Sequence, residues 1–132
     1  MLVRSLCVAM LLVGNAMAGE FATLGAEIRA SRDSLVNMML RPELKTLEQQ
    51  KLVKSTADAV SAHLNRLTPP AGKAAQFKEL KAAWAAFKKL REEEVVPAVV
   101  AGDYEKAKKL AGGVQKERLA RCQALVLELD GV

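Results

Sequence analysis

The chain has 132 residues, with 20 Lys and Arg against 15 Asp and Glu and a net charge of +5. This length fits one small domain, and a basic excess so mild and so mixed with acidic residues excludes a nucleic-acid-binding surface. Only 8 Gly and 4 Pro accompany abundant Ala, Leu, Lys and Glu, a composition that favours helices.

The first eighteen residues predict a secretory signal peptide. Arg4 precedes an uncharged apolar run over residues 6–13, and Ala16-Met17-Ala18 forms a small-x-small cleavage pattern. The run is shorter than the roughly 20 apolar residues of a membrane span. We therefore expect cleavage after Ala18 and a periplasmic domain of residues 19–132, in which 19 basic and 15 acidic residues leave a charge of +4. An uncleaved N-terminal anchor at the inner membrane is the alternative.

Two cysteines are present, and they are not expected to pair. Cys7 lies in the predicted signal peptide, so Cys122 is alone in the mature domain. Cys122 falls on an apolar helical stripe, which predicts a buried thiol, and a thiol available to a partner is the alternative.

The first predicted helix of the mature domain shows one apolar face. Its members recur in steps of three and four, with a single polar member, Ser31. They are Phe21, Leu24, Ile28, Ser31, Leu35 and Met38. Arg41-Pro42 interrupts the helix, and Pro42 suits the first turn of the next one.

A second helix is predicted over residues 43–67. Its seam consists of Val53, Ala57, Val60, Leu64 and Leu67. The helix stops at Thr68-Pro69-Pro70, where Thr68 is the predicted N-cap of a third helix and Pro69 its first residue.

The third and fourth helices carry the remaining seams. The third is predicted to bury Phe77, Leu80, Trp84, Phe87 and then Leu90 or Arg91. Pro97 predicts a kink or a loosened last turn, and Asp103 is the predicted N-cap of the fourth helix.

The fourth helix has two apolar stripes that are out of phase, with Gly112-Gly113 between them, which predicts a bend. The stripes are Ala107, Leu110, Ala111 and Val114, then Leu119, Cys122, Val126 and Leu129. Four such helices with short connections predict an all-α fold, an antiparallel up-down-up-down four-helix bundle after the signal peptide.

Few residues suggest chemistry. His63 is the single histidine, beside the seam of the second helix, and it is predicted to lie at an edge or on the surface. Without a second His or a paired Cys, neither a zinc site nor covalent haem attachment is supported. The acidic run Glu92-Glu93-Glu94 is predicted to be a solvated face, since adjacent helical residues diverge. Ser31, Ser34, Ser55 and Ser61 have no predicted base, so we expect no enzyme and no cofactor.

A haem- or metal-carrying bundle using His63 with Met38 or Met39 is the alternative function. The stretch from Gly102 to Lys109 resembles part of the soluble b-type bundle cytochromes. That family takes Met from near the start of its first helix and His from its last. Here Met38 is late in the first helix and the last helix has no His, so the resemblance does not supply the ligands.

Arg29 and Arg32 are the candidate ligand-binding residues. They lie one turn apart near the edge of the first seam, where they could receive an anionic ligand such as a carboxylate. A solvated face or an inter-helix ion pair is the ordinary alternative for such a pair.

The second half carries a resemblance to a known family. The residues that carry it are Leu67-Thr68-Pro69, Phe77, Trp84-Ala85-Ala86-Phe87, Glu94-Val95-Val96-Pro97 and Ala101-Gly102-Asp103-Tyr104-Glu105-Lys106-Ala107. Over residues 67–129 the chain resembles the extracytoplasmic four-helix-bundle sensor domain of methyl-accepting chemotaxis receptors. The resemblance implies a ligand-sensing module, often dimeric, whose first and last helices continue into membrane spans.

The chain departs from that family after Leu129, where we find no second span, HAMP-like linker or methylated coiled coil. We therefore expect a stand-alone, non-enzymatic sensor-like domain in signal transduction. Its expected partners are a small-molecule ligand or a periplasmic or inner-membrane protein, with a homodimer among the states that the family suggests. A purely structural or stress-type helical protein is the third hypothesis.

Overall fold

The computed structural model describes residues 2–131, and it describes side chains for residues 19–131. The predicted signal peptide, residues 1–18, lies outside the described side chains. The elements are α1 (Leu2–Leu40), η1 (Pro42–Leu44), α2 (Leu47–Arg66), α3 (Ala74–Leu90), η2 (Arg91–Val95), α4 (Val96–Ala101), α5 (Tyr104–Gly112) and α6 (Val114–Leu129). Residues 2–131 contain no strand, which confirms the all-α prediction.

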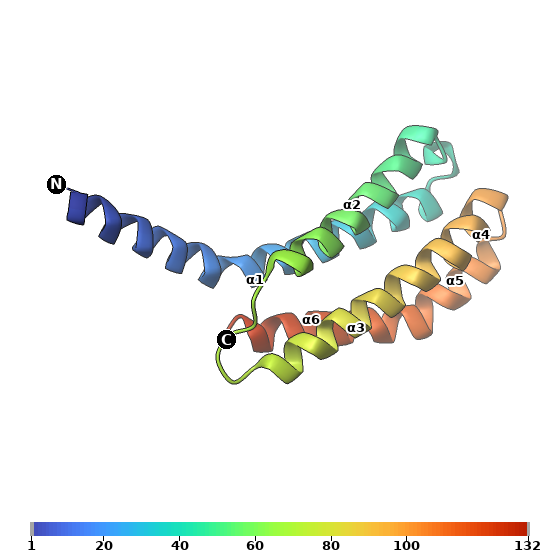
Figure 1. Ribbon diagram of the computed structural model, residues 1–132. Helices are drawn as coiled ribbons and strands as arrows, with labels where there is room; N and C mark the ends of the chain where they lie inside the picture. The colour runs from blue at the N-terminus through green and yellow to red at the C-terminus, as the bar shows by residue number, and fades with distance from the viewer. Residues whose placement is uncertain (1, 132) are drawn as a thin grey trace.

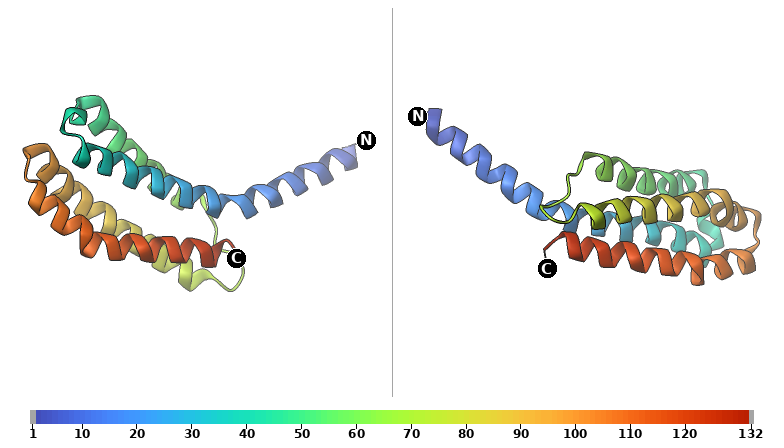
Figure 2. Two further views of the ribbon diagram at one scale, coloured as in Figure 1. Left: turned by 180° about the vertical axis from the view of Figure 1, so that it is seen from behind. Right: turned by 60° about the horizontal axis from the view of Figure 1, so that its bottom comes forward.

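The chain forms four long helical segments: α1, α2, α3 continued through η2 into α4, and α5 followed by α6 (Figure 1). The most extensive contacts join α1 to α2 and α3 to α6, and α6 also packs against α1. The turn after α1 and the turn after α4 lie at one end of the assembly. The loop between α2 and α3 lies at the other end with the C terminus (Figures 1 and 2). The fold is therefore two pairs of helical segments joined along their length.

The predicted seams are the buried faces. All six members of the first seam are at most 7% exposed. Val53, Ala57, Val60 and Leu64 of the second seam are buried, and Leu67 packs partly buried at its end. Helical spacing alone identified these positions, because an amphipathic helix can bury only one face.

Of the two predicted N-caps, Asp103 is confirmed and Thr68 is not, while the cap of α2, Thr46, was not predicted. Thr46 Oγ1 accepts a hydrogen bond from the Gln49 amide at the start of α2, after the short 3₁₀ helix η1. Asp103 accepts from the Lys106 amide at the start of α5, as predicted.

The predicted N-cap at Thr68 is wrong, because α3 begins at Ala74 after Lys73. The chain first makes a turn in which the Lys73 amide donates to the Pro70 carbonyl. Gly72 has φ of 77°, a left-handed conformation that no helix residue adopts. The helix therefore starts five residues later than predicted.

Two hydrophobic cores lie along the molecule, separated by buried polar residues. One core joins α1, α2, α3 and α6 around Trp84, and the other joins the far ends of α1 and α2 to η2, α4 and α5. Between them lie four buried polar residues, which we call the polar layer: Ser31, Ser34, Arg91 and Gln115. The polar layer is the part of the fold that an apolar pattern does not specify.

The third segment contains a π-helical turn, η2, at the level of the polar layer. We attribute this turn to Pro97, which follows it in the chain. Pro97 has no amide to donate to the Glu93 carbonyl, and its ring would collide with that carbonyl in a regular α-helix. The Val96 amide instead reaches back to the Arg91 carbonyl, five residues away. The predicted loosening near Pro97 is confirmed, and it widens the turn that carries Arg91.

At the paired glycines, where a bend is predicted, the helix is interrupted, since α5 ends at Gly112 and α6 begins at Val114. A Cβ on Gly113 would lie 2.9 Å from the Lys109 carbonyl oxygen, whereas a Cβ on Gly112 would meet nothing within 4 Å. Gly113 is thus the residue that the break requires.

No helix in the described part of the chain has both the length and the apolar character needed to cross a membrane.

Candidate ligand-binding site

The main candidate site is a cleft of about 410 Å³ between α1, η2, α5 and α6, which we call the basic cleft. Its apolar wall comes mainly from α1, with contributions from α3, η2 and α6: Leu35, Val36, Met39, Leu40, Phe87, Val95 and Leu119. Ala111 and Gly112, next to the break between α5 and α6, complete its edge. The bend at the paired glycines thus forms one margin of the cleft.

The charged lining of the basic cleft is entirely cationic. Arg32, Arg91, Lys108 and Lys116 line it, and no Asp or Glu does. Arg32 pairs with its neighbour Asp33 at 3.1 Å, but both of these side chains are more than half exposed, so this pair contributes little. The cleft therefore offers apolar contact together with a positive potential.

Arg91 is the unusual member of the lining. Its residue is only 1% exposed, and its Nη2 donates to the Ser31 carbonyl at 2.8 Å and to the Val53 carbonyl at 2.9 Å. A longer contact of 3.5 Å reaches Ser34 Oγ. The side chain of the third segment thus binds the backbones of α1 and α2 and ties the two helix pairs together.

The Arg91 guanidinium has no carboxylate partner within the described part of the chain, and its Nε and Nη1 are buried without a hydrogen-bond partner. Burial lowers the pKa of Arg91 to about 10, against a smaller opposing effect of the Glu92 charge. The side chain is still a cation at neutral pH. A buried cation held only by neutral carbonyls is costly, because carbonyl dipoles replace water without supplying a counter-charge.

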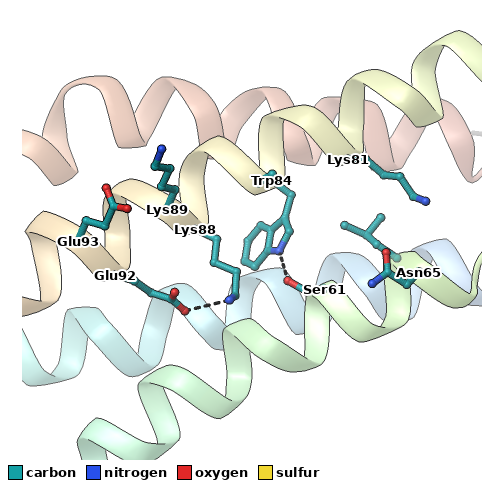
Figure 3. A pocket seen from close by; sticks show the side chains of 10 residues that line it. Ser61, Asn65, Lys81, Trp84, Lys88, Lys89, Glu92 and Glu93 are labelled. Carbon is teal, nitrogen blue, oxygen red and sulfur yellow. Dashed lines mark hydrogen bonds and ion pairs between the residues drawn. The ribbon is translucent and has the colours of Figure 1, made fainter.

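A second hollow of about 410 Å³ lies between α2 and α3 (Figure 3). Several of its polar groups already have partners. The Trp84 indole donates to Ser61 Oγ at 3.0 Å, and Lys88 pairs with Asp58 at 2.9 Å and with Glu92 at 3.0 Å. Burial lowers the pKa of Lys88, but the hydrogen bonds to Asp58 and Glu92 outweigh it and raise the pKa overall. This hollow carries charges of both signs, and Lys88 and Trp84 in its lining already have partners, so the basic cleft is the better candidate for a charged ligand.

A third cavity of about 400 Å³ lies between α2 and η2, and Arg91 lines it as well. Lys51, Lys54 and Glu92 also line this cavity, so its charges are mixed. Arg91 therefore stands between two openings, and only the basic cleft lacks an acidic residue.

The structure separates the two predicted ligand-binding residues. Arg32 lines the basic cleft, while Arg29 is exposed and does not line it. Their spacing of about one turn puts both arginines on one side of α1. The cleft begins at Arg32 and continues toward the C-terminal end of α1, so Arg29 lies outside it.

The prediction that His63 lies at an edge or on the surface is wrong, because His63 is 4% exposed. Its Nε2 lies 2.5 Å from Glu20, and its Nδ1 bonds to Glu27. These two carboxylates lie two turns apart on α1, so both can face the same ring on α2. Carboxylates only accept hydrogen bonds, so a ring with both nitrogens bound to them donates twice and is an imidazolium.

This arrangement affects the alternative haem function. A haem-ligating histidine needs one free ring nitrogen, and here both nitrogens of His63 are engaged by glutamates. Met38 is fully buried in the second core, and Met39 lines the basic cleft. The structure therefore offers no observation that favours His63 with either methionine as a ligand pair. No cluster of three or more metal-ligating side chains occurs among the described residues.

The remaining reactive side chains have structural roles. Cys122 is fully buried as predicted, and burial raises the pKa of its thiol to about 11. Each of Ser31, Ser34, Ser55 and Ser61 donates its hydroxyl to a carbonyl of its own helix. A hydroxyl engaged in this way is not an activated nucleophile.

Sequence reasoning missed Arg91 as a site residue. The signal was the seam of the third segment, where spacing allowed either Leu90 or Arg91 as the next buried position. A charged residue at a seam position, six residues before a proline, indicates a polar group inside the bundle.

Comparisons with protein-family models, with curated proteins and with solved structures find no match to this chain.

Proposed function

We propose that this chain is a non-enzymatic, sensor-like helical domain that binds a small ligand in signal transduction. In this proposal it is exported to the periplasm by a signal peptide cleaved after Ala18. The mature domain is an antiparallel up-down-up-down four-helix bundle resembling the sensor domains of methyl-accepting chemotaxis receptors. A periplasmic or inner-membrane protein would receive the signal, with a homodimer as the working assembly.

One observation carries the proposal: a buried arginine with no carboxylate partner borders a cleft that is lined by cations and apolar side chains. Structural helical proteins gain stability by removing such groups, since an unpaired buried charge costs free energy. A binding protein gains from keeping it, because the ligand supplies the missing charge and the protein then discriminates bound from free. Arg91 also contacts α1 and α2, so a ligand at Arg91 would act on both helix pairs.

A thermal-shift screen of organic acids and amino acids tests the proposal on the purified periplasmic protein. A ligand at about 100 times its Kd stabilises the folded state by about 2.7 kcal/mol, which raises the Tm by several degrees for a domain of this size. Size exclusion with light scattering measures whether the dimer forms. No shift with any compound, together with no partner in a periplasmic pull-down, would favour the purely structural hypothesis instead.

A further inference from the structure

We propose that the ligand of the basic cleft is an organic anion with an apolar body, of the class of medium-chain or aromatic carboxylates and sulfonates. Its anionic group would lie toward Arg91 and its apolar body along the wall from α1. This inference rests on the proposed ligand-binding function and adds the chemical class.

The distribution of charged side chains indicates that the ligand is an anion. Several cations elsewhere have an acidic partner: Lys54 and Lys88 pair with Asp58, and Arg121 pairs with Glu79. The basic cleft gathers cations from α1, η2, α5 and α6 without a single acidic residue in its lining. Cations contributed by four elements to one opening produce a potential that attracts a negative ligand and repels a positive one.

The unmet hydrogen-bonding capacity of Arg91 gives the anion a specific receptor. Nη2 is occupied by two carbonyls, while Nε and Nη1 have no partner. A guanidinium N–H is a strong donor to an anionic oxygen, and Nε and Nη1, on opposite edges of the guanidinium, would each donate singly. An anion that reaches one of these donors from the cleft would satisfy it and neutralise the buried charge, so part of its affinity comes from relieving a cost that the free protein carries.

The apolar wall favours an anion with an apolar body over a purely polar anion such as inorganic phosphate or a short dicarboxylate. Leu35, Met39, Phe87 and Leu119 line the cleft, and a fully hydrated ion would leave these side chains without a contact. The volume of about 410 Å³ lies within the range of about 300–1,000 Å³ that is usual for small-molecule sites. An apolar body of about eight carbon atoms would cover these side chains. Binding would then be favoured by the removal of apolar surface, of both ligand and cleft, from water.

Two fluorescent probes that differ mainly in charge test the inference. Anilinonaphthalene sulfonate is an apolar anion, and N-phenylnaphthylamine is its neutral counterpart. We expect the anionic probe to bind the folded protein more tightly, by about tenfold or more. We also expect added salt to weaken the binding of the anionic probe and to leave the binding of the neutral probe unchanged, since salt screens the cations of an open cleft.

Matched double variants locate the binding. Lys108→Gln with Lys116→Gln removes two cleft charges, and Lys78→Gln with Lys109→Gln removes two exposed charges that do not line the cleft. We expect the first double variant to bind the anionic probe about tenfold more weakly and the second to bind like the wild type. Because all four lysines are exposed, both double variants should fold normally. Arg91→Met should cause the largest loss, and circular dichroism checks that it folds.

The results of these binding measurements distinguish a failure of the anionic ligand class from a failure of ligand binding itself. Equal binding of the two probes, or an equal response of the two double variants, would overturn the anionic ligand class while leaving a ligand-binding cleft. No binding of either probe to the folded protein would overturn both. Preferential binding of the anionic probe that is lost only in the cleft variant supports both.

Discussion

At the scale of single residues, two buried cations behave differently because their partners differ. His63 is bound on both sides by glutamates of α1, so its charge is compensated. Arg91 meets only carbonyls and a hydroxyl, so its charge is not. A compensated cation fastens two helices together, whereas an uncompensated one is suited to receive a ligand.

The pairing of His63 predicts a pH dependence of stability. Burial alone would lower its pKa, but the hydrogen bonds that His63 donates to Glu20 and Glu27 raise the pKa above the ordinary value of 6.5. A raised folded-state pKa means that the stabilisation is complete below about 6.5 and is lost as the pH rises through the folded value. The urea midpoint of the wild type should therefore fall over that interval more than the midpoint of His63→Gln.

An NMR titration of the single imidazole gives the pKa of His63 directly. Glu27→Gln should lower that pKa, because it removes one of the two charges that hold the proton. Glu48→Gln serves as the control, since Glu48 is exposed on α2 and belongs to none of these ion pairs. A wild-type value at or below the ordinary 6.5 would contradict the double pairing.

The thiol of Cys122 should be unreactive in the folded protein. It is 0% exposed and its pKa is raised to about 11, so almost no thiolate is accessible at pH 8. In a Cys7→Ser background, a disulfide reagent should label Cys122 only after denaturant is added. Ser55→Cys, on an exposed position of α2, should react at once in the same buffer. Rapid labelling of folded Cys122 would mean that α6 is not packed as described.

At the scale of the elements, the sequence predicted the buried faces of the helices correctly, but it predicted only some of the positions where helices start or are interrupted. Periodicity identified the buried faces because a helix repeats its environment every three to four residues. Pro97 and the paired glycines marked real irregularities, since each changes the backbone itself. Thr68 misled, because a capping residue ahead of two prolines can also begin a turn.

The candidate site was only partly predictable, for a physical reason. Arg32 was identified from its own helix, whereas the basic cleft needs α1, η2, α5 and α6 to meet. Which side chains face each other across helices depends on the register between them, and one helix's pattern does not contain that register. The pairing of His63 with Glu20 and Glu27 was missed for the same reason.

The paired glycines give a matched test of the bend between α5 and α6. Gly113→Ala should destabilise the protein by about 1 kcal/mol or more, because its Cβ would lie 2.9 Å from the Lys109 carbonyl oxygen. Gly112→Ala should stabilise it by about 0.5–1 kcal/mol, since that Cβ meets nothing and Ala is the better helix former. Thermal unfolding followed by circular dichroism measures both. Equal effects of the two substitutions would show that the bend does not depend on Gly113.

At the scale of the whole molecule, the polar layer joins the two helix pairs at the point where the basic cleft opens. Arg91 from the third segment binds the backbones of α1 and α2, and Gln115 of α6 donates to the Phe87 carbonyl at 2.9 Å. A ligand that changes the hydrogen bonding of Arg91 would therefore change how the pairs are held together. Such a shift between helices is a small displacement that a partner protein can detect.

The measurement that tests this account most directly is an NMR titration of the Arg91 side chain with octanoate, with octanol as the neutral control. We expect the signals of the Arg91 Nε–H and the Gln115 side-chain amide to shift with octanoate until they saturate, and to stay in place with octanol. The Trp84 indole signal, which lies between α2 and α3 outside the basic cleft, should move far less. Saturating shifts centred on Trp84, or an Arg91 signal that octanoate leaves unchanged, would contradict it.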